Sequence, residues 1–133
     1  KMICREDGPS YGAMIKIGAT ALCEAFEENR VQESQNHHFF GDILRVFVKS
    51  LAGLEINPNM NNINEVAFSP IVVENMNFAK TEYNCSKGII KSGWERNGEK
   101  VRMYIELPDG IEGKAKICGS EKELKAGLNE FLV

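Results

Sequence analysis

The polar side chains best suited to acid–base chemistry lie in one short stretch and in the segment before it. Glutamate and histidine are common general acids and bases, and connecting loops on a rigid scaffold often carry such groups. Adjacent histidines usually point in different directions, and the chain has no HExxH pattern, so the residues do not favour a metal site. A plainer interpretation stays open, in which a histidine hydrogen-bonds a helix end and the glutamate is solvated. The residues concerned are Glu24, Asn36, His37, His38 and Asp42.

Glu24 falls at an unusual place in the apolar pattern around it. In a helix it would follow Ala21 by three residues and would lie two residues from Leu22 and Phe26. This spacing puts it at the margin of the apolar face. A carboxylate at such a margin can be partly desolvated, and desolvation raises the pKa of a carboxyl group toward the range of a general base. The sequence leaves open whether Glu24 is desolvated.

The other nucleophilic side chains have no supporting motif. Ser34 and Cys23 lack the local sequence of a nucleophile elbow. The four cysteines have no CxxC spacing, and a chain of this length can form a core without disulfides. We therefore expect free, mostly buried thiols, and we expect no metal and no cofactor. The cysteines are Cys4, Cys23, Cys85 and Cys118.

Two helices are predicted in the first part of the chain. Apolar residues recur every three or four positions from Tyr11 to Asn29, after a capping residue at Ser10, with Gly18 inside the helix. A second helix is expected from His38 to Ala52, ending at Gly53. It is apolar over more than half its circumference, and such a helix is normally covered on two sides.

Short strands are predicted in the remainder. An Asn-rich stretch over 57–64 is the best candidate boundary. The segment 66–73 is interrupted by Pro70, which indicates an edge or a bend. The segments 78–84, 88–95 and 101–107 follow, with Asn97-Gly98 as a hairpin turn, and residues 115–117 belong to a further strand. We interpret 120–133 as a hairpin-like strand pair and the whole part as a β-sandwich.

Composition excludes several classes of function. The 133 residues are 43% hydrophobic and 26% charged, with a net charge of −3. They suffice for one ordinary domain or two small pieces. A net acidic chain without a basic patch does not favour nucleic acid, and no apolar run is long enough for a membrane span.

Trp94 admits two interpretations. As the only tryptophan it could stack on a sugar, but its place in a predicted strand favours packing. If Trp94 and Tyr104 shared one exposed face, sugar binding would be favoured. If both were buried, the sandwich would be structural.

Several motifs in order resemble one family. They are Pro9-Ser10-Tyr11-Gly12-Ala13-Met14-Ile15, Gly18-Ala19-Thr20-Ala21-Leu22-Cys23-Glu24-Ala25-Phe26, Ser34-Gln35-Asn36-His37-His38-Phe39-Phe40-Gly41-Asp42, Leu51-Ala52-Gly53-Leu54 and Ser86-Lys87-Gly88-Ile89-Ile90-Lys91-Ser92-Gly93-Trp94. Leu107-Pro108 and Lys125-Ala126-Gly127 also fit. The chain resembles the C-terminal part of bacterial α-L-rhamnosidases of glycoside hydrolase family 78.

The resemblance implies an α+β organisation. Residues 1–56 would be the last helices of an (α/α)₆-barrel catalytic domain, and residues 57–133 a C-terminal antiparallel β-sandwich. It also implies an inverting hydrolase that removes terminal α-L-rhamnose, so a rhamnose-containing carbohydrate would be the partner. The over-apolar second helix would then have partners elsewhere in the barrel.

The resemblance also implies roles for single residues. Glu24 matches the general base, His37 a residue that contacts rhamnose, and Asn36 and Gly41 belong to the same motif. The general acid would come from an earlier part of the barrel. The chain departs from the family at Cys23, where Trp is common, and at Ala21, where Thr is usual.

Two expectations follow for the isolated chain. It should be inactive on rhamnosides, and it should shield its exposed helix faces by self-association or against its own sandwich. The competing interpretation is a non-catalytic carbohydrate-binding or structural sandwich with a helical extension. Linkage, aglycone and cellular compartment stay open.

Overall fold

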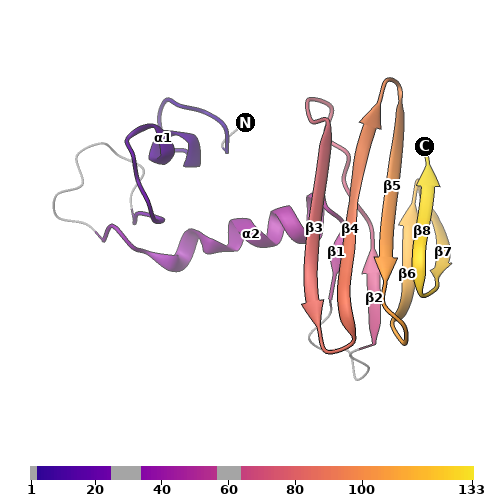
Figure 1. Cartoon of the computed structure of the whole chain (residues 1–133). Coiled ribbons are helices and arrows are strands. Elements are labelled where there is room, and N and C mark those ends of the chain that lie inside the picture. The colour runs from indigo at the N-terminus through magenta and orange to yellow at the C-terminus, as the bar shows by residue number, and fades with distance from the viewer. Residues whose placement is uncertain (1–2, 25–33, 57–63) are drawn as a thin grey trace. The chain divides into compact units, whose positions relative to one another are not determined.

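A computed structural model describes residues 3–24, 34–56 and 64–133. The chain divides into two compact units, Lys1–Ile43 and Leu44–Val133. Figure 1 shows helix α1 of the first unit and strands β1 to β8 of the second. In the described part of the chain, no helix is long and apolar enough to cross a membrane.

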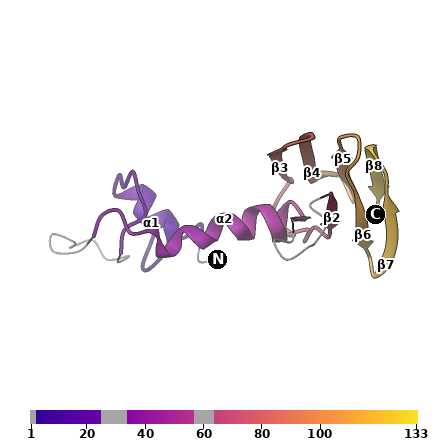
Figure 2. The same ribbon diagram turned by 90° about the horizontal axis from the view of Figure 1, so that it is seen from below.

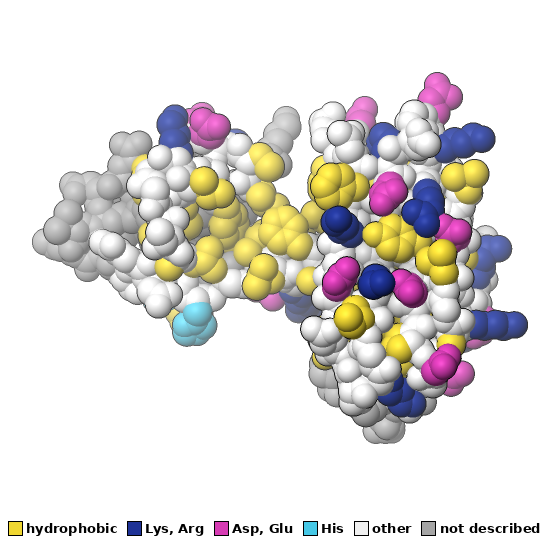
Figure 3. Space-filling model, in the orientation of Figure 1, with side chains coloured by type: hydrophobic (Ala, Val, Ile, Leu, Met, Phe, Trp, Pro, Cys, Tyr) yellow, Lys and Arg dark blue, Asp and Glu magenta, His cyan; other side chains and the backbone are white. Residues whose placement is uncertain are grey.

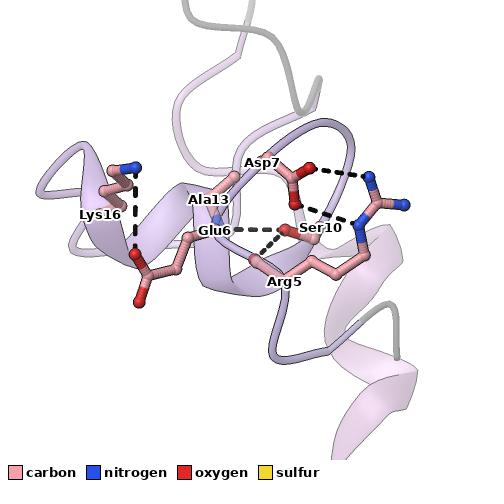
Figure 4. Close-up of polar contacts among 6 residues, drawn as sticks. All are labelled: Arg5, Glu6, Asp7, Ser10, Ala13 and Lys16. Atoms are coloured by element: carbon pink, nitrogen blue, oxygen red, sulfur yellow. Dashed lines mark hydrogen bonds and ion pairs between the residues drawn. The ribbon is translucent and has the colours of Figure 1, made fainter.

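Helix α1 spans Tyr11–Lys16 and begins at the predicted cap. The Ser10 hydroxyl oxygen accepts the backbone N–H of Ala13 at 3.0 Å, as expected of an N-cap. The same hydroxyl donates to the carbonyl oxygen of Arg5, so it also fixes the preceding loop (Figure 4). That loop lies so close that a Cβ atom on Gly12 would be 2.2 Å from the Arg5 carbonyl oxygen. Glycine is therefore required here for close backbone contact.

The prediction that this helix continues beyond Gly18 is wrong for residues 19–24, and residues 25–29 lie outside the described residues. Gly18 has a φ of 76° and does not continue the helix. Its N–H bonds the carbonyl of Ile15, and the N–H of Ala19 bonds that of Met14, both at 2.9 Å. These bonds form a Schellman motif, in which glycine ends a helix at low cost in strain. The spacing of the apolar residues alone did not predict that the helix ends here.

The second helical segment agrees with its predicted bounds. It comprises η1, a 3₁₀ helix over His38–Asp42, then α2 over Ile43–Arg45, then η2, a π-helical stretch over Val46–Leu51. Gly53, with a φ of 79°, follows Ala52 as the expected stop. A Cβ on Gly53 would also lie 2.5 Å from the Pro70 nitrogen, so this glycine serves both a left-handed turn and a close contact.

The second unit holds two four-stranded sheets packed as layers (Figure 2). One sheet has the order β1-β2-β6-β7 and the other β3-β4-β5-β8. Every pairing is antiparallel except that of β2 with β6. The strands are β1 Leu54–Glu55, β2 Glu65–Phe68, β3 Phe78–Cys85, β4 Gly88–Asn97, β5 Lys100–Leu107, β6 Glu112–Ile117, β7 Ser120–Leu124 and β8 Gly127–Leu132.

The predicted sandwich is confirmed, with two corrections of detail. The β4–β5 hairpin exists, but Asn97 pairs with Lys100, so Gly98 and Glu99 form its loop. Gly98 has a φ of 64°, which a two-residue hairpin loop commonly needs at its first position. The final two strands were expected to pair with each other, but they do not. β7 pairs with β6 and β8 with β5, in different sheets, because the chain crosses between layers at 125–126.

The core lies between the sheets. Strand β5 alternates buried and outward residues, and in β4 the alternate residues Ile90, Ser92 and Trp94 are fully buried, with Trp94 at 0% exposure. The Phe68 and Phe131 rings, from opposite sheets, stack with centroids 6.2 Å apart. The cysteines are free as predicted, but only Cys23 is buried, so the expectation of mostly buried thiols is wrong. The remaining fully buried large side chains are Leu54, Ile90 and Ile105.

Candidate functional site

Two extended stretches of the first unit lie side by side and position the predicted site residues. The backbone N–H of Glu24 donates to the Ser34 carbonyl oxygen at 2.8 Å. Farther along, the His37 N–H donates to the Leu22 carbonyl oxygen at 2.6 Å. Residues 22–24 therefore run beside 34–37. We call the residues in these two stretches, together with Phe39, the Glu24–His37 site.

The Glu24 carboxylate faces the imidazole of His37. Its Oε2 atom accepts the Ser34 N–H at 3.1 Å and lies 3.9 Å from His37 Nδ1. The second distance exceeds a hydrogen bond but allows charge attraction when the imidazole is protonated. The Glu24 side chain is 49% exposed and the His37 side chain 24%. Water thus reaches the carboxylate.

The element that carries Glu24 differs from the expectation. Glu24 follows the end of α1 and is not helical, so the argument from the margin of an apolar helix face is wrong for it. Backbone pairing with Ser34, and not helical phase, sets its direction. The preceding Cys23 is buried at 4% exposure, with Sγ 3.7 Å from the Ala21 carbonyl oxygen.

Two aromatic rings, of His38 and Phe39, lie beside the imidazole of His37. The Phe39 ring meets it edge-on with centroids 4.6 Å apart, and the His38 ring is stacked at 6.2 Å. Phe39 is 73% exposed, so the cluster presents an apolar rim beside the polar pair. Sequence reasoning missed Phe39, although its position next to the histidines was the available signal.

Asn36 and Asp42 have different relations to this site. The Asn36 N–H donates to the Ser34 hydroxyl at 3.4 Å, and the residue is exposed. Asp42 lies in η1 and is also exposed. A Cβ on Gly41 would be 3.9 Å from Leu22 Cδ1, an ordinary contact. Within the described ranges, no three His, Cys, Asp or Glu side chains group closely enough to hold a metal ion.

Trp94 and Tyr104 lie on opposite faces of their sheet. Trp94 points into the core, whereas Tyr104 pairs with Gly93 on the outer face. Arg102 lies over the Tyr104 ring, 5.2 Å from its centroid. Burial, followed by the negative charge of Glu95, raises the pKa of the Tyr104 hydroxyl. Figure 3 shows charged side chains of both signs among apolar ones over this sheet. Trp94 and Tyr104 therefore do not share an exposed face.

Comparison with known families assigns both parts of the chain. Residues 56–131 match the bacterial alpha-L-rhamnosidase C-terminal domain. Residues 1–51 match the bacterial alpha-L-rhamnosidase 6 hairpin glycosidase domain. The chain belongs to the bacterial α-L-rhamnosidase family. The resemblance and the fold class expected from the sequence motifs are confirmed.

Solved α-L-rhamnosidases share the fold. The enzyme from Dictyoglumus thermophilum is 23% identical with a TM-score of 0.82, and covers 98% of this chain and 18% of its own. That from Aspergillus terreus is 16% identical with a TM-score of 0.85, covering 99% and 16%. That from Streptomyces avermitilis, complexed with L-rhamnose, is 16% identical with a TM-score of 0.82, covering 99% and 15%.

The chain thus spans less than a fifth of the length of these α-L-rhamnosidases. No curated protein sequence matched it. At these identities the likeness to solved structures establishes the rhamnosidase fold, and the roles of Glu24, Asn36 and His37 rest on other arguments.

Proposed function

We propose that the chain is the C-terminal part of an inverting α-L-rhamnosidase that removes terminal α-L-rhamnose from rhamnosides. Residues 1–56 would be the last helices of its (α/α)₆-barrel catalytic domain and residues 57–133 its β-sandwich. The order of the two family matches along the chain supports this assignment. The observation that carries the proposal is the closeness of Glu24 to His37, with a carboxylate oxygen 3.9 Å from the imidazole.

Glu24 is the general base of this proposal. In an inverting glycosidase, one carboxylate takes a proton from water while a second carboxylic acid protonates the leaving oxygen. Ser34 donates to Oε2 of Glu24, and Oε1 has no hydrogen bond from a described residue. In this proposal Oε1 accepts a proton from a bound water. The general acid, about 6.5–9.5 Å away across the sugar, comes from an earlier part of the barrel.

His37 and Asn36 bind the sugar in this proposal. The Nδ1 atom of His37 is on the side of Glu24, which leaves Nε2 to hydrogen-bond a rhamnose hydroxyl. Asn36 presents an exposed amide with donor and acceptor atoms. The exposed ring of Phe39 adds an apolar surface that suits the C–H face or methyl group of the sugar.

The test uses the full-length gene product and an aryl α-L-rhamnoside. Glu24→Gln should lower kcat about 10²-fold or more, because removal of a positioned base costs on that order. Glu121→Gln, on the exposed strand β7, is the matched control and should leave kcat unchanged. NMR of the first sugar formed should show β-L-rhamnose. Full activity of the Glu24→Gln enzyme, or α-L-rhamnose as the first product, would contradict the proposal.

The purified 133-residue chain should not hydrolyse the same substrate. General acid and base act together, and most substrate contacts would be missing. Turnover by the isolated chain that Glu24→Gln abolishes would contradict this part of the proposal while supporting the base. A non-catalytic sugar-binding sandwich is the alternative, and the burial of Trp94 weighs against it.

A further inference from the structure

Two buried side chains of strand β4 hydrogen-bond the end of the preceding helix. The Trp94 indole N–H donates to the Leu51 carbonyl oxygen at 2.9 Å. The Ser92 hydroxyl donates to the Ala52 carbonyl oxygen at 3.1 Å. Trp94 and Ser92 are both at 0% exposure, so these bonds form away from water.

Two backbone groups of the segment after β2 complete the pattern. The Ile71 N–H donates to the Ser50 carbonyl oxygen at 2.8 Å, and the Ser69 N–H to the Gly53 carbonyl oxygen at 2.9 Å. The carbonyls of residues 50, 51, 52 and 53 therefore each accept a hydrogen bond from the sandwich. We call these donors, from Ser69, Ile71, Ser92 and Trp94, the helix-end site.

Three of the four carbonyls lie at the carboxyl end of η2, because Ser50 and Leu51 are in the helix and Ala52 is its C-cap, while Gly53 follows it. The last four carbonyls of a helix have no partners within it, and they carry about half a negative charge. Buried carbonyls left unpaired would each cost free energy comparable to a lost hydrogen bond. Donors spaced to meet consecutive carbonyls remove that cost, whereas a surface that merely touched the helix would not.

Packing supports the same arrangement. Val48 and Leu51 of η2 pack against the sandwich core, and Ala52 and Leu54 are fully enclosed. The compact unit that contains the sandwich begins at Leu44, although the six-hairpin match extends to residue 51. The helix end thus shares its core with the sandwich.

We infer that the helix-end site is an interaction surface of the sandwich whose partner is the carboxyl end of the last six-hairpin helix, and that residues 44–53 fold and unfold with the sandwich. The junction between the two family regions, at 52–55, is then not a linker. It is part of the core of the second unit. The inference rests on the proposed division into barrel and sandwich, and not on the catalytic roles of Glu24 and His37.

Hydrogen exchange in the whole chain tests this directly, because Trp94 is the only tryptophan and gives one indole N–H signal by NMR. The indole proton and the Ala52 amide, which bonds the Phe47 carbonyl at 2.9 Å, should exchange at the rate of core amides in β4 and β5. Exchange of both within minutes, while those core amides stay protected, would overturn the inference.

Matched variants separate the site from general packing. Ser92→Ala removes a side-chain donor, whereas Ser69→Ala keeps the donating backbone N–H and is its control. Ser92→Ala should speed exchange of the Ala52 amide by about tenfold or more relative to core amides, since a buried acceptor is left unpaired. Ser69→Ala should leave it unchanged. Equal protection of the Ala52 amide in both variants would also overturn the inference.

Discussion

The indole nitrogen of Trp94 lies 2.9 Å from the carbonyl oxygen of Leu51, joining strand β4 to the end of η2 across 43 residues. The side chain is fully buried, so one residue contributes both core volume and a polar anchor. This relationship gives Trp94 a structural role inside the sandwich, where it is not exposed to a sugar.

The two contributions of Trp94 can be separated by substitution. Trp94→Phe keeps a buried ring but leaves the Leu51 carbonyl unpaired, and should lower the free energy of unfolding by about 1–3 kcal/mol. Trp94→Ala also creates a cavity, and should lower it by about 3–5 kcal/mol. Urea unfolding of the whole chain measures both. Tyr104→Phe, on the outer face, should change it by about 0.5 kcal/mol or less. Equal effects of Trp94→Phe and Tyr104→Phe would contradict the prediction.

Gly53 should be more sensitive to substitution than other glycines with positive φ. Gly53→Ala forces a Cβ to within 2.5 Å of the Pro70 nitrogen at a φ of 79°. Gly98→Ala meets a similar φ of 64° with nothing within 4 Å, and is therefore the control. The control should cost about 1–2 kcal/mol from backbone strain alone. Gly53→Ala should lower the free energy of unfolding clearly more than Gly98→Ala in the same urea experiment. An equal loss would show that the contact with Pro70 relaxes without cost.

Much of the sandwich could be predicted from local pattern. Alternating apolar residues in 101–107 predicted a strand, and Gly98 predicted a hairpin turn. Both signals are local, because side-chain alternation and turn strain act over a few residues. Partner choice was not predictable in the same way. The separation of β7 from β8 into different sheets depends on which layer has an open edge, and the parallel pairing of β2 with β6 joins residues far apart in sequence.

The candidate site also has features that the sequence predicts and features that it does not. The sequence motifs named Glu24 and His37, and the structure brings them together. The helical argument for Glu24 was wrong because Gly18 ends α1, and the backbone pairing of 22–24 with 34–37 could not be read from periodicity. Likewise Trp94 was correctly favoured as packing, but its hydrogen bond to Leu51 needed the fold.

A chain that begins at Leu44 should fold, whereas one that begins at residue 57 should not fold stably. Residues 44–133 form a compact unit that retains the helix end and β1. The shorter chain lacks the partners of Trp94 and Ser92 and exposes the core beneath Leu54. Circular dichroism and Trp94 fluorescence should show cooperative thermal unfolding only for 44–133. Indistinguishable unfolding of the two chains would contradict a structural role for residues 44–56.

Alkaline pH should destabilise the sandwich in part through Tyr104. Its pKa is raised in the folded chain, first by burial and then by Glu95, so folding favours the neutral hydroxyl. The unfolded hydroxyl ionises near pH 10, so this stability is complete below about pH 10 and is lost as pH rises through the folded pKa. Absorbance titration at 295 nm should show a late-titrating tyrosine that is missing in Tyr104→Phe. If Tyr104→Phe instead removed a tyrosine that titrates early, the pKa of Tyr104 would be lowered and not raised, and the prediction would be wrong.

The isolated chain should self-associate through the apolar surface of its second helix. Leu44 is 67% exposed and Phe47 41%, although the helix is apolar enough to need cover on two sides. Light scattering should show species larger than a monomer, and a hydrophobic dye should bind. Replacing Leu44 and Phe47 with Ser should reduce both signals, whereas Leu128→Ser, at a residue on β8 that is 55% exposed, should not. A monomer that binds no dye would show that these side chains need no partner. The full-length protein should lack the dye signal, because the remaining six-hairpin helices would cover the same residues.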